Sequence, residues 1–171
     1  MNLKEFNNLV DFFFYQADRQ NPNEIFLESL NPINRRSYTW AETVLNIYKI
    51  SKVIKKNCKE GDRVLLVSEN RPEWFMSDLA IMLSKAITVP TYTTYTTNDY
   101  KYLIDDCEPS IIIVSNNFLH KKIENIISNK EFVKKIITFD NVAKGNYIEK
   151  YLDFHSIIKT KLSENDKVKQ I

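Results

Sequence analysis

Few residues of this 171-residue chain could do chemistry, and their spacing matches no catalytic motif. The histidines are His120 and His155, and neither has a second ligand at the spacing of a metal site. His120 precedes two lysines on a predicted helix, so we expect it to face solvent, and we expect the same of His155. Cys58 and Cys107 lie at predicted helix ends, where half-buried free thiols are the plain interpretation.

The small number of glycines and the position of the acidic pair also argue against a catalytic or phosphate-binding site in this chain. The sequence has only two glycines, Gly61 and Gly145. A loop that binds phosphate needs glycines, because its backbone N–H groups must approach the ligand closely. The motifs GxGxxG, GxxxxGK[ST] and GxSxG are absent. The pair Asp105-Asp106 closes a predicted helix and is expected to face solvent. The sequence therefore predicts no catalytic, cofactor-binding or metal-binding residue in this chain.

One hydroxyl-rich segment, residues 91–97, has the sequence TYTTYTT. It follows a predicted strand at residues 86–90, so it lies at the edge where parallel α/β sheets bind ligands. Its hydroxyls could donate to a polar ligand. The alternative, which we favour, is an extended loop whose last threonines cap the next helix.

The elements that would position these residues alternate between strands and helices. Short apolar, β-branched runs recur about every 25 residues, close to the length of a βαβ unit. Such continuous runs suit parallel strands that are covered on both faces. The predicted strands are residues 63–67, 86–90, 111–114 and 135–139, and the helices between them are residues 72–85, 96–107 and 117–129. The sequence therefore predicts an α/β fold with a parallel βαβ sheet flanked by helices.

Further elements are predicted before and after this sheet. An amphipathic helix at residues 3–17 precedes a hairpin of strands 25–29 and 36–39, with a turn at 31–34. Thr39 and Glu42 have the spacing of a capping box for the next helix. A last helix is expected at residues 151–162, and residues 163–171 form a polar linker. We therefore assign residues 1–162 to one domain and 163–171 to the linker.

The charge balance and the apolar segments argue against nucleic-acid binding and against a membrane-spanning segment. Lys and Arg number 24 against 22 Asp and Glu, so the net charge of +2 indicates no nucleic-acid partner. The apolar run at Phe12–Tyr15 is too short to span a membrane and has no signal-peptide flanks. The chain is thus predicted to be cytoplasmic, with peripheral membrane contact at most.

Four blocks together resemble the adenylate-forming enzymes, and most closely the bacterial long-chain acyl-CoA synthetases. They agree in order and spacing over residues 20–140. Ser84-Lys85 departs from the pattern, because the family often has a glycine turn there. The blocks are RSYTWAE at 36–42, GDRVLLVSENRPEW at 61–74, AITVPTYTT at 86–94 and SIIIVS at 110–115.

The resemblance implies an incomplete N-terminal lobe of the adenylate-forming fold, from a long-chain fatty acid–CoA ligase. Such an enzyme uses ATP, Mg²⁺ and CoA to convert a fatty acid first to an acyl-adenylate and then to a thioester. The family's phosphate loop and catalytic lysine match no position here, so the chain is not expected to be catalytic alone. Its expected partners are the remainder of the enzyme or a second copy.

Two alternatives stay open. The chain could be a non-catalytic α/β module for dimerisation or partner binding. It could also be a receiver-like domain of flavodoxin topology, but no Asp follows the predicted strands at 63–67 or 111–114, where that chemistry would need one.

Overall fold

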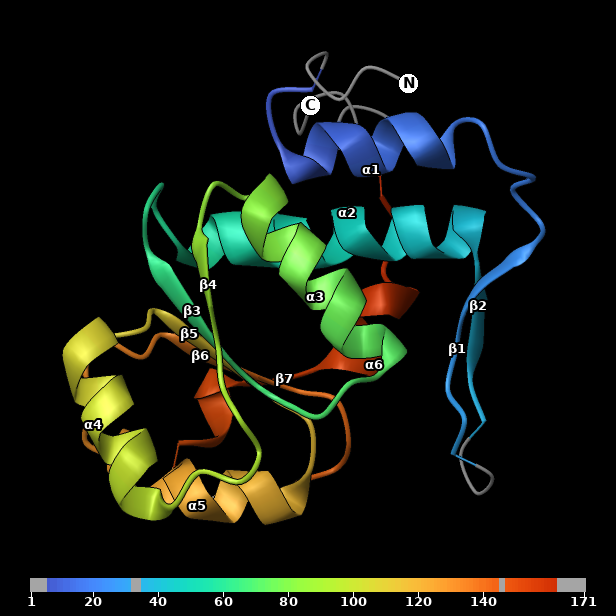
Figure 1. The fold of residues 1–171 in the computed structure, drawn as a ribbon. Coiled ribbons are helices and arrows are strands. Elements are labelled where there is room, and N and C mark those ends of the chain that lie inside the picture. Colours follow the sequence, from blue (N-terminus) through green and yellow to red (C-terminus); the bar gives the residue numbers. More distant parts are fainter. Residues whose placement is uncertain (1–5, 32–34, 145–146, 163–171) are drawn as a thin grey trace.

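A five-stranded sheet forms the centre of the computed structural model, which describes residues 6–31, 35–144 and 147–162. The strand order is β4-β3-β5-β6-β7 (Figure 1). Each neighbouring pair runs parallel, so the predicted α/β fold class is confirmed. The strands are β3 (Arg63–Val67), β4 (Ile87–Pro90), β5 (Ile111–Val114), β6 (Lys135–Thr138) and β7 (Tyr151–Asp153).

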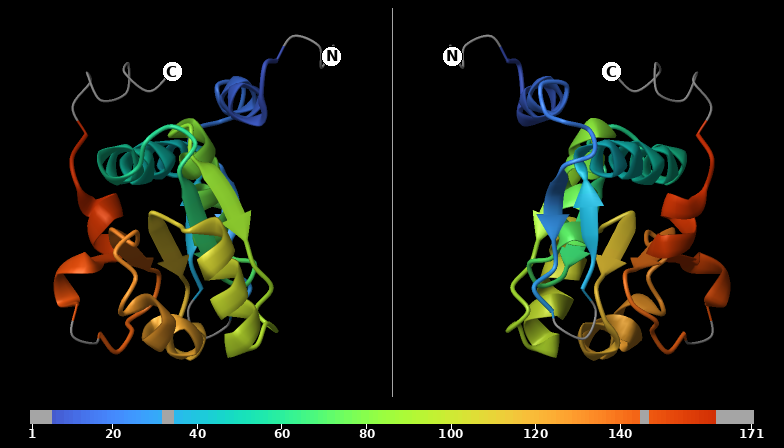
Figure 2. Two further views of the ribbon diagram at one scale, coloured as in Figure 1. Left: turned by 90° about the vertical axis from the view of Figure 1, so that its left-hand side faces the viewer. Right: turned by 90° about the vertical axis from the view of Figure 1, so that its right-hand side faces the viewer.

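Helices cover both faces of this sheet (Figure 2). Alternate residues of β3 explain the two layers: Val64 and Leu66 belong to one apolar core, and Leu65 and Val67 belong to the other. All four side chains are fully buried, as expected for a strand that is covered on both sides. The first core holds α2 (Trp40–Asn57), α3 (Pro72–Leu83) and α6 (Phe154–Lys159), and the second holds α4 (Thr97–Cys107) and α5 (Asn117–Ile127).

Side-chain caps set the starts of these helices. Thr39 and Glu42 form the predicted capping box of α2, and Thr96 and Asp99 form that of α4. Each cap satisfies backbone N–H groups that the first helical turn leaves free, which stabilises the helix by about 1 kcal/mol. Asn116 caps α5 in the same way, by accepting from the N–H of Leu119.

The N-terminal part differs from its prediction at one end. Asn8 caps α1 (Leu9–Ala17), so the helix begins later than residue 3, and residues 6–8 lie outside it. The predicted hairpin is confirmed as β1 (Ile25–Glu28) paired antiparallel with β2 (Ser37–Thr39). Its predicted turn falls largely on residues 32–34, outside the described residues. Stacked rings fix the hairpin to the helices, with Phe26 and Trp40 centroids 3.7 Å apart.

The C-terminal part was predicted wrongly. Instead of one helix over 151–162, a short 3₁₀ turn, η2 (Ile148–Lys150), leads into β7 and then α6. Residues 151–153 pair with Ile136–Thr138, so sheet pairing overrides the local helical pattern. Asp153 ends the strand and caps α6 through the N–H of Ser156. The predicted linker, residues 163–171, lies outside the described residues.

Two residues with a left-handed backbone conformation form part of the turns before β3 and β4. Gly61 has φ +81°, a conformation that glycine adopts without strain. Lys85 has φ 59°, at the position where the resemblance leads one to expect glycine. The Gly61 N–H donates to the Lys85 carbonyl at 2.9 Å, so the two turns support each other at the amino edge of the sheet.

Candidate functional site

The candidate site lies where the strand order reverses. From β3 the chain continues to β4 on one side and later to β5 on the other. Open α/β sheets bind ligands outside the carboxyl ends of the strands at this point. A pocket of about 550 Å³ opens here, between the hairpin and the segments that follow β3, β5 and β6. Its lining comprises Glu28, Ser29, Leu30, Asn31, Arg36, Glu69, Asn70, Arg71, Pro72, Glu73, Asn116 and Asp140.

Glu73 is the most buried charge of this pocket, with 1% of its side chain exposed. It accepts hydrogen bonds from Arg36 at 2.8 Å and from Arg71 at 2.9 Å. The Tyr38 hydroxyl also donates to it at 3.5 Å. Burial opposes its ionisation, but the bond and charge of Arg71 outweigh burial and lower its pKa. Burial and the Glu73 charge raise the pKa of Tyr38 to about 12, so that phenol stays protonated.

Arg71 connects the start of α3 to the end of β6. Its two terminal nitrogens bind both oxygens of Asp140 at 3.0 and 3.1 Å. The guanidinium also lies 5.4 Å from the Phe139 ring centroid. Burial disfavours its charge, yet Asp140 and Glu73 raise its pKa. Such a two-pronged pair fixes geometry as well as contributing energy.

Glu69 connects the ends of β3 and β5. It accepts from the Ser115 hydroxyl at 2.5 Å and from the Asn116 amide at 3.3 Å. Arg71 lies 3.4 Å from its other oxygen. The Ser115 hydroxyl therefore donates to a carboxylate that Asn116 and Arg71 also contact, and this ties the end of β5 to the segment after β3.

His155 closes the network on the side of α6. Arg36 donates to its Nε2 at 2.7 Å, so the ring is a neutral acceptor. Burial and the Arg36 charge lower its pKa. His155 is half-buried, so the prediction that it faces solvent is only partly correct, because Arg36 of the hairpin lies against its ring.

Two guanidiniums, of Arg36 and Arg71, face the three carboxylates of Glu69, Glu73 and Asp140, so this network has one carboxylate in excess. Both cations that line this pocket are therefore already paired with carboxylates, and no glycine is among its lining residues. Among the described residues, no group of three His, Cys, Asp or Glu side chains could hold a metal ion. The arrangement suits a rigid ionic frame for the carboxyl edge.

The first three residues of the TYTTYTT segment, 91–93, line a second pocket of about 500 Å³ together with Trp74, and this pocket shares Glu69 and Asn70 with the first. Thr96 caps α4, which confirms the favoured interpretation for that residue. The Lys122 ammonium donates to the carbonyls of Thr93 and Tyr95 at 3.0 and 2.9 Å, so the loop is anchored by its backbone. The Tyr92 side chain stays 72% exposed.

His120 is fully buried, so its predicted exposure is wrong. Its Nε2 lies 2.7 Å from the Tyr151 hydroxyl of β7. Burial lowers its pKa, although Glu124 opposes this. The signal was present in the sequence, since His120 shares helical spacing with the buried residues Ile123 and Ile127.

The two cysteines and Asp105 show no sign of reactivity in this structure. Cys58 and Cys107 are free and half-buried, as predicted. Burial raises the pKa of Cys58 to about 11 and also raises that of Cys107, so both stay thiols. Asp105 pairs with Lys101 at 2.8 Å on the surface of α4.

The family model described as "AMP-binding enzyme" matches residues 13–167. Among curated proteins, fatty acyl-CoA synthetase A of Dictyostelium discoideum is 28% identical over 119 residues, which are 69% of this chain and 17% of that protein. Long-chain-fatty-acid–CoA ligase FadD15 of Mycobacterium tuberculosis is 27% identical over 114 residues, 66% of this chain and 19% of that protein. The chain thus spans under a fifth of the length of these two relatives.

Solved structures show the same fold. An anthranilate CoA ligase, AuaEII, in complex with anthranoyl-AMP superposes with a TM-score of 0.77 at 23% identity, over 93% of this chain and 30% of that one. Coronafacic acid ligase from Pectobacterium brasiliense superposes with a TM-score of 0.74 at 19% identity, over 87% of this chain and 29% of that one. The predicted resemblance of the fold is therefore confirmed.

Proposed function

Because the chain belongs to the family of AMP-binding enzymes, we propose that the protein of which it is part activates a fatty acid for thioester formation. In the reaction implied by this family, the carboxylate attacks the α-phosphate of ATP and releases pyrophosphate. The CoA thiol then displaces AMP from the acyl-adenylate. The observation that carries the proposal is the family match over 13–167, with relatives named as fatty acyl-CoA synthetases.

The preference for long acyl chains is the finer part of the proposal. It is supported by the four sequence blocks that resemble long-chain synthetases and by the name of the mycobacterial relative. A human mitochondrial relative is named only as an acyl-coenzyme A synthetase, ACSM3, at 26% identity over 124 residues. Chain length is therefore the property to measure first.

Within this enzyme, we assign the described residues to support rather than chemistry. They offer no ligand set for Mg²⁺ and no glycine loop for a triphosphate. We therefore place the contacts with ATP, Mg²⁺ and CoA outside them and derive no catalytic step through them. The role that fits Glu73, Arg71 and Asp140 is to hold the carboxyl edge of the sheet in one geometry.

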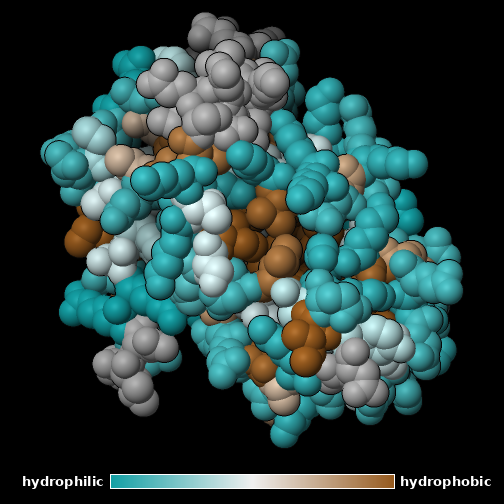
Figure 3. All heavy atoms as spheres, turned by 180° about the vertical axis from the view of Figure 1, so that it is seen from behind, coloured by the Kyte–Doolittle hydropathy of each residue, from teal (hydrophilic) through white to brown (hydrophobic). Residues whose placement is uncertain are grey.

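The remainder of the enzyme, or a second copy, is the partner that we propose. Figure 3 shows a largely hydrophilic face with a hydrophobic hollow near its centre, which further protein could cover. No helix within the described ranges is long and apolar enough to cross a membrane. A cytoplasmic location remains our prediction.

The test is an assay of the polypeptide encoded by the whole reading frame around these residues. We expect exchange of pyrophosphate into ATP that depends on added fatty acid, followed by acyl-CoA formation, with long chains preferred. The 171-residue chain alone should give neither. Absence of acid-dependent exchange with fatty acids of every length would overturn the proposal.

A further inference from the structure

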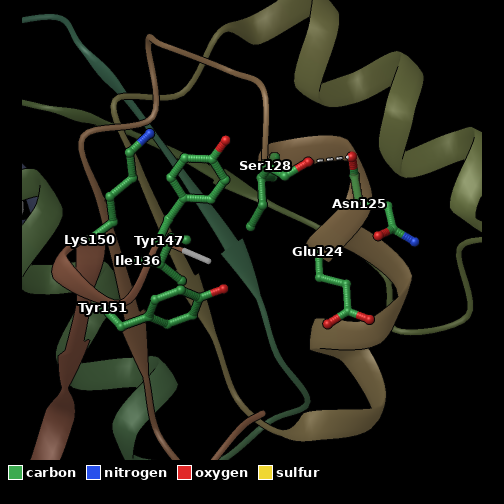
Figure 4. A pocket seen from close by; sticks show the side chains of 8 residues that line it. Glu124, Asn125, Ser128, Ile136, Tyr147, Lys150 and Tyr151 are labelled. Atoms are coloured by element: carbon green, nitrogen blue, oxygen red, sulfur yellow. Dashed lines mark hydrogen bonds between the residues drawn. The ribbon is translucent and has the colours of Figure 1, made fainter. Parts of the chain in front are cut away.

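A separate pocket of about 270 Å³ lies between α5 and the η2–β7 segment (Figure 4). It shares no lining residue with the two pockets at the carboxyl edge. Its volume suits one small ligand rather than a nucleic-acid strand. Nothing in the proposed acyl activation uses it.

Its two walls differ in chemistry. One wall carries the rings of Tyr147 and Tyr151 beside the Lys150 side chain, and the other carries Glu124 and Asn125 of α5. Figure 4 shows the Tyr151 hydroxyl directed toward α5. Aromatic faces opposite an acidic and an amide side chain would hold a flat molecule that has hydrogen-bonding edges.

His120 lies behind this pocket and is incompletely satisfied. Its Nε2 bonds the Tyr151 hydroxyl, but its buried Nδ1 has no hydrogen-bond partner among the described residues. The nearest oxygen of Glu124 is 3.6 Å away, too far for a hydrogen bond. No side chain of the described ranges donates to the Glu124 carboxylate, so its oxygens remain open to a ligand.

The surrounding groups favour binding over catalysis. Burial and the Glu124 charge raise the pKa of Tyr151, so its phenol is a neutral donor and no nucleophile. The Lys150 ammonium donates to the Lys130 carbonyl at 3.5 Å and lies 5.3 Å from the Tyr147 ring centroid. It balances the charge of Glu124, so the pocket as a whole suits an uncharged ligand.

We propose that this pocket binds a nucleobase or nucleoside that carries an exocyclic amine. Carboxylates accept hydrogen bonds from the amine of cytosine, and asparagine pairs with the amine and ring nitrogen of adenine. Tyrosine rings stack on either base. Glu124 would accept from the amine, Asn125 would pair with the ring edge, and the two phenol rings would cover the base.

The experiment is a calorimetric titration of the 171-residue chain with adenosine, cytidine and uridine. We expect saturable binding of adenosine or cytidine, and about tenfold weaker binding of uridine, which presents a carbonyl where cytidine has an amine. Equal binding of uridine, or no saturable binding of any nucleoside, would overturn the proposal.

Variants on the surface of α5 sharpen this test without threatening the fold. Glu124→Ala and Asn125→Ala should each weaken binding about tenfold, because each removes the side chain that would make a specific hydrogen bond to the base. Asn129→Ala, an exposed position just beyond α5 that does not line the pocket, should bind like the wild type. Unchanged binding in both pocket variants would reject the assignment. Neither variant should alter acid-dependent pyrophosphate exchange, so the two proposals can fail separately.

Discussion

Glu73 and His120 are both buried ionisable side chains, yet their surroundings differ. Glu73 has two guanidiniums and a phenol directed at its carboxylate. His120 has one phenol at Nε2 and no hydrogen-bond partner at Nδ1 within the described part of the chain. Buried polar groups are normally satisfied, so the first is typical of a structural frame. The second indicates where a further group could add contacts.

The largest expected effect is at Glu73. Glu73→Gln removes one charge from a buried ionic group and leaves two guanidiniums without it, which should lower the free energy of unfolding by about 3–5 kcal/mol. Urea denaturation would measure this. The matched variant Glu69→Gln, at a carboxylate 45% exposed, should cost about 1 kcal/mol or less. Equal losses would contradict the comparison.

The next effect concerns the shape of the Arg71 contact. Arg71→Lys keeps the charge but cannot hold both oxygens of Asp140, so we expect a loss of about 1–3 kcal/mol. Thermal unfolding would report it. If lysine proved as stabilising as arginine, the two-pronged geometry would have no energetic role.

The two histidines and Glu73 should affect stability in different pH windows. His120 and His155 have pKa values lowered from 6.5, so the unfolded chain takes up protons first, and stability falls as pH drops below 6.5. Glu73 has a pKa lowered from 4.5, so its contribution is present above 4.5 and is lost as pH falls further. Denaturation midpoints measured from pH 7 to about pH 3 should therefore fall in two stages. A single fall below pH 4.5 would show that the histidines are accessible in the folded state.

The smallest change is expected for His120→Leu. Leucine fills similar space and removes both the unpartnered Nδ1 and the Nε2 bond to Tyr151. These two changes oppose each other, so stability at neutral pH should change by about 1 kcal/mol or less. The upper stage of the pH dependence should shrink, with His155 maintaining the rest. A loss as large as that of Glu73→Gln would mean that His120 is structural after all.

Most strands were predictable because they are continuous apolar runs that few other structures can accommodate. The three residues of β7 carry no such pattern, since their pairing with β6 defines them as a strand. The ionic network was missed for a related reason. Glu69 and Arg71 follow β3, whereas Asp140 follows β6, and only the sheet order brings these side chains together. The burial of His120 could have been predicted from its helical spacing, but the two lysines that follow it suggested an exposed position.

The position of β3 between β4 and β5 has a consequence for how the chain is made. Its β4 partner lies 24 residues further along, at Ile87 opposite Arg63, while Ile111 of β5, opposite Val64, is 47 residues away. During synthesis, one edge of this apolar strand can be paired early, and the other stays open until β5 has emerged. At about 5–20 residues per second, that interval lasts seconds. A strand edge left open for that time favours pairing with other chains, so ribosome-associated chaperones should protect this part of the nascent protein most.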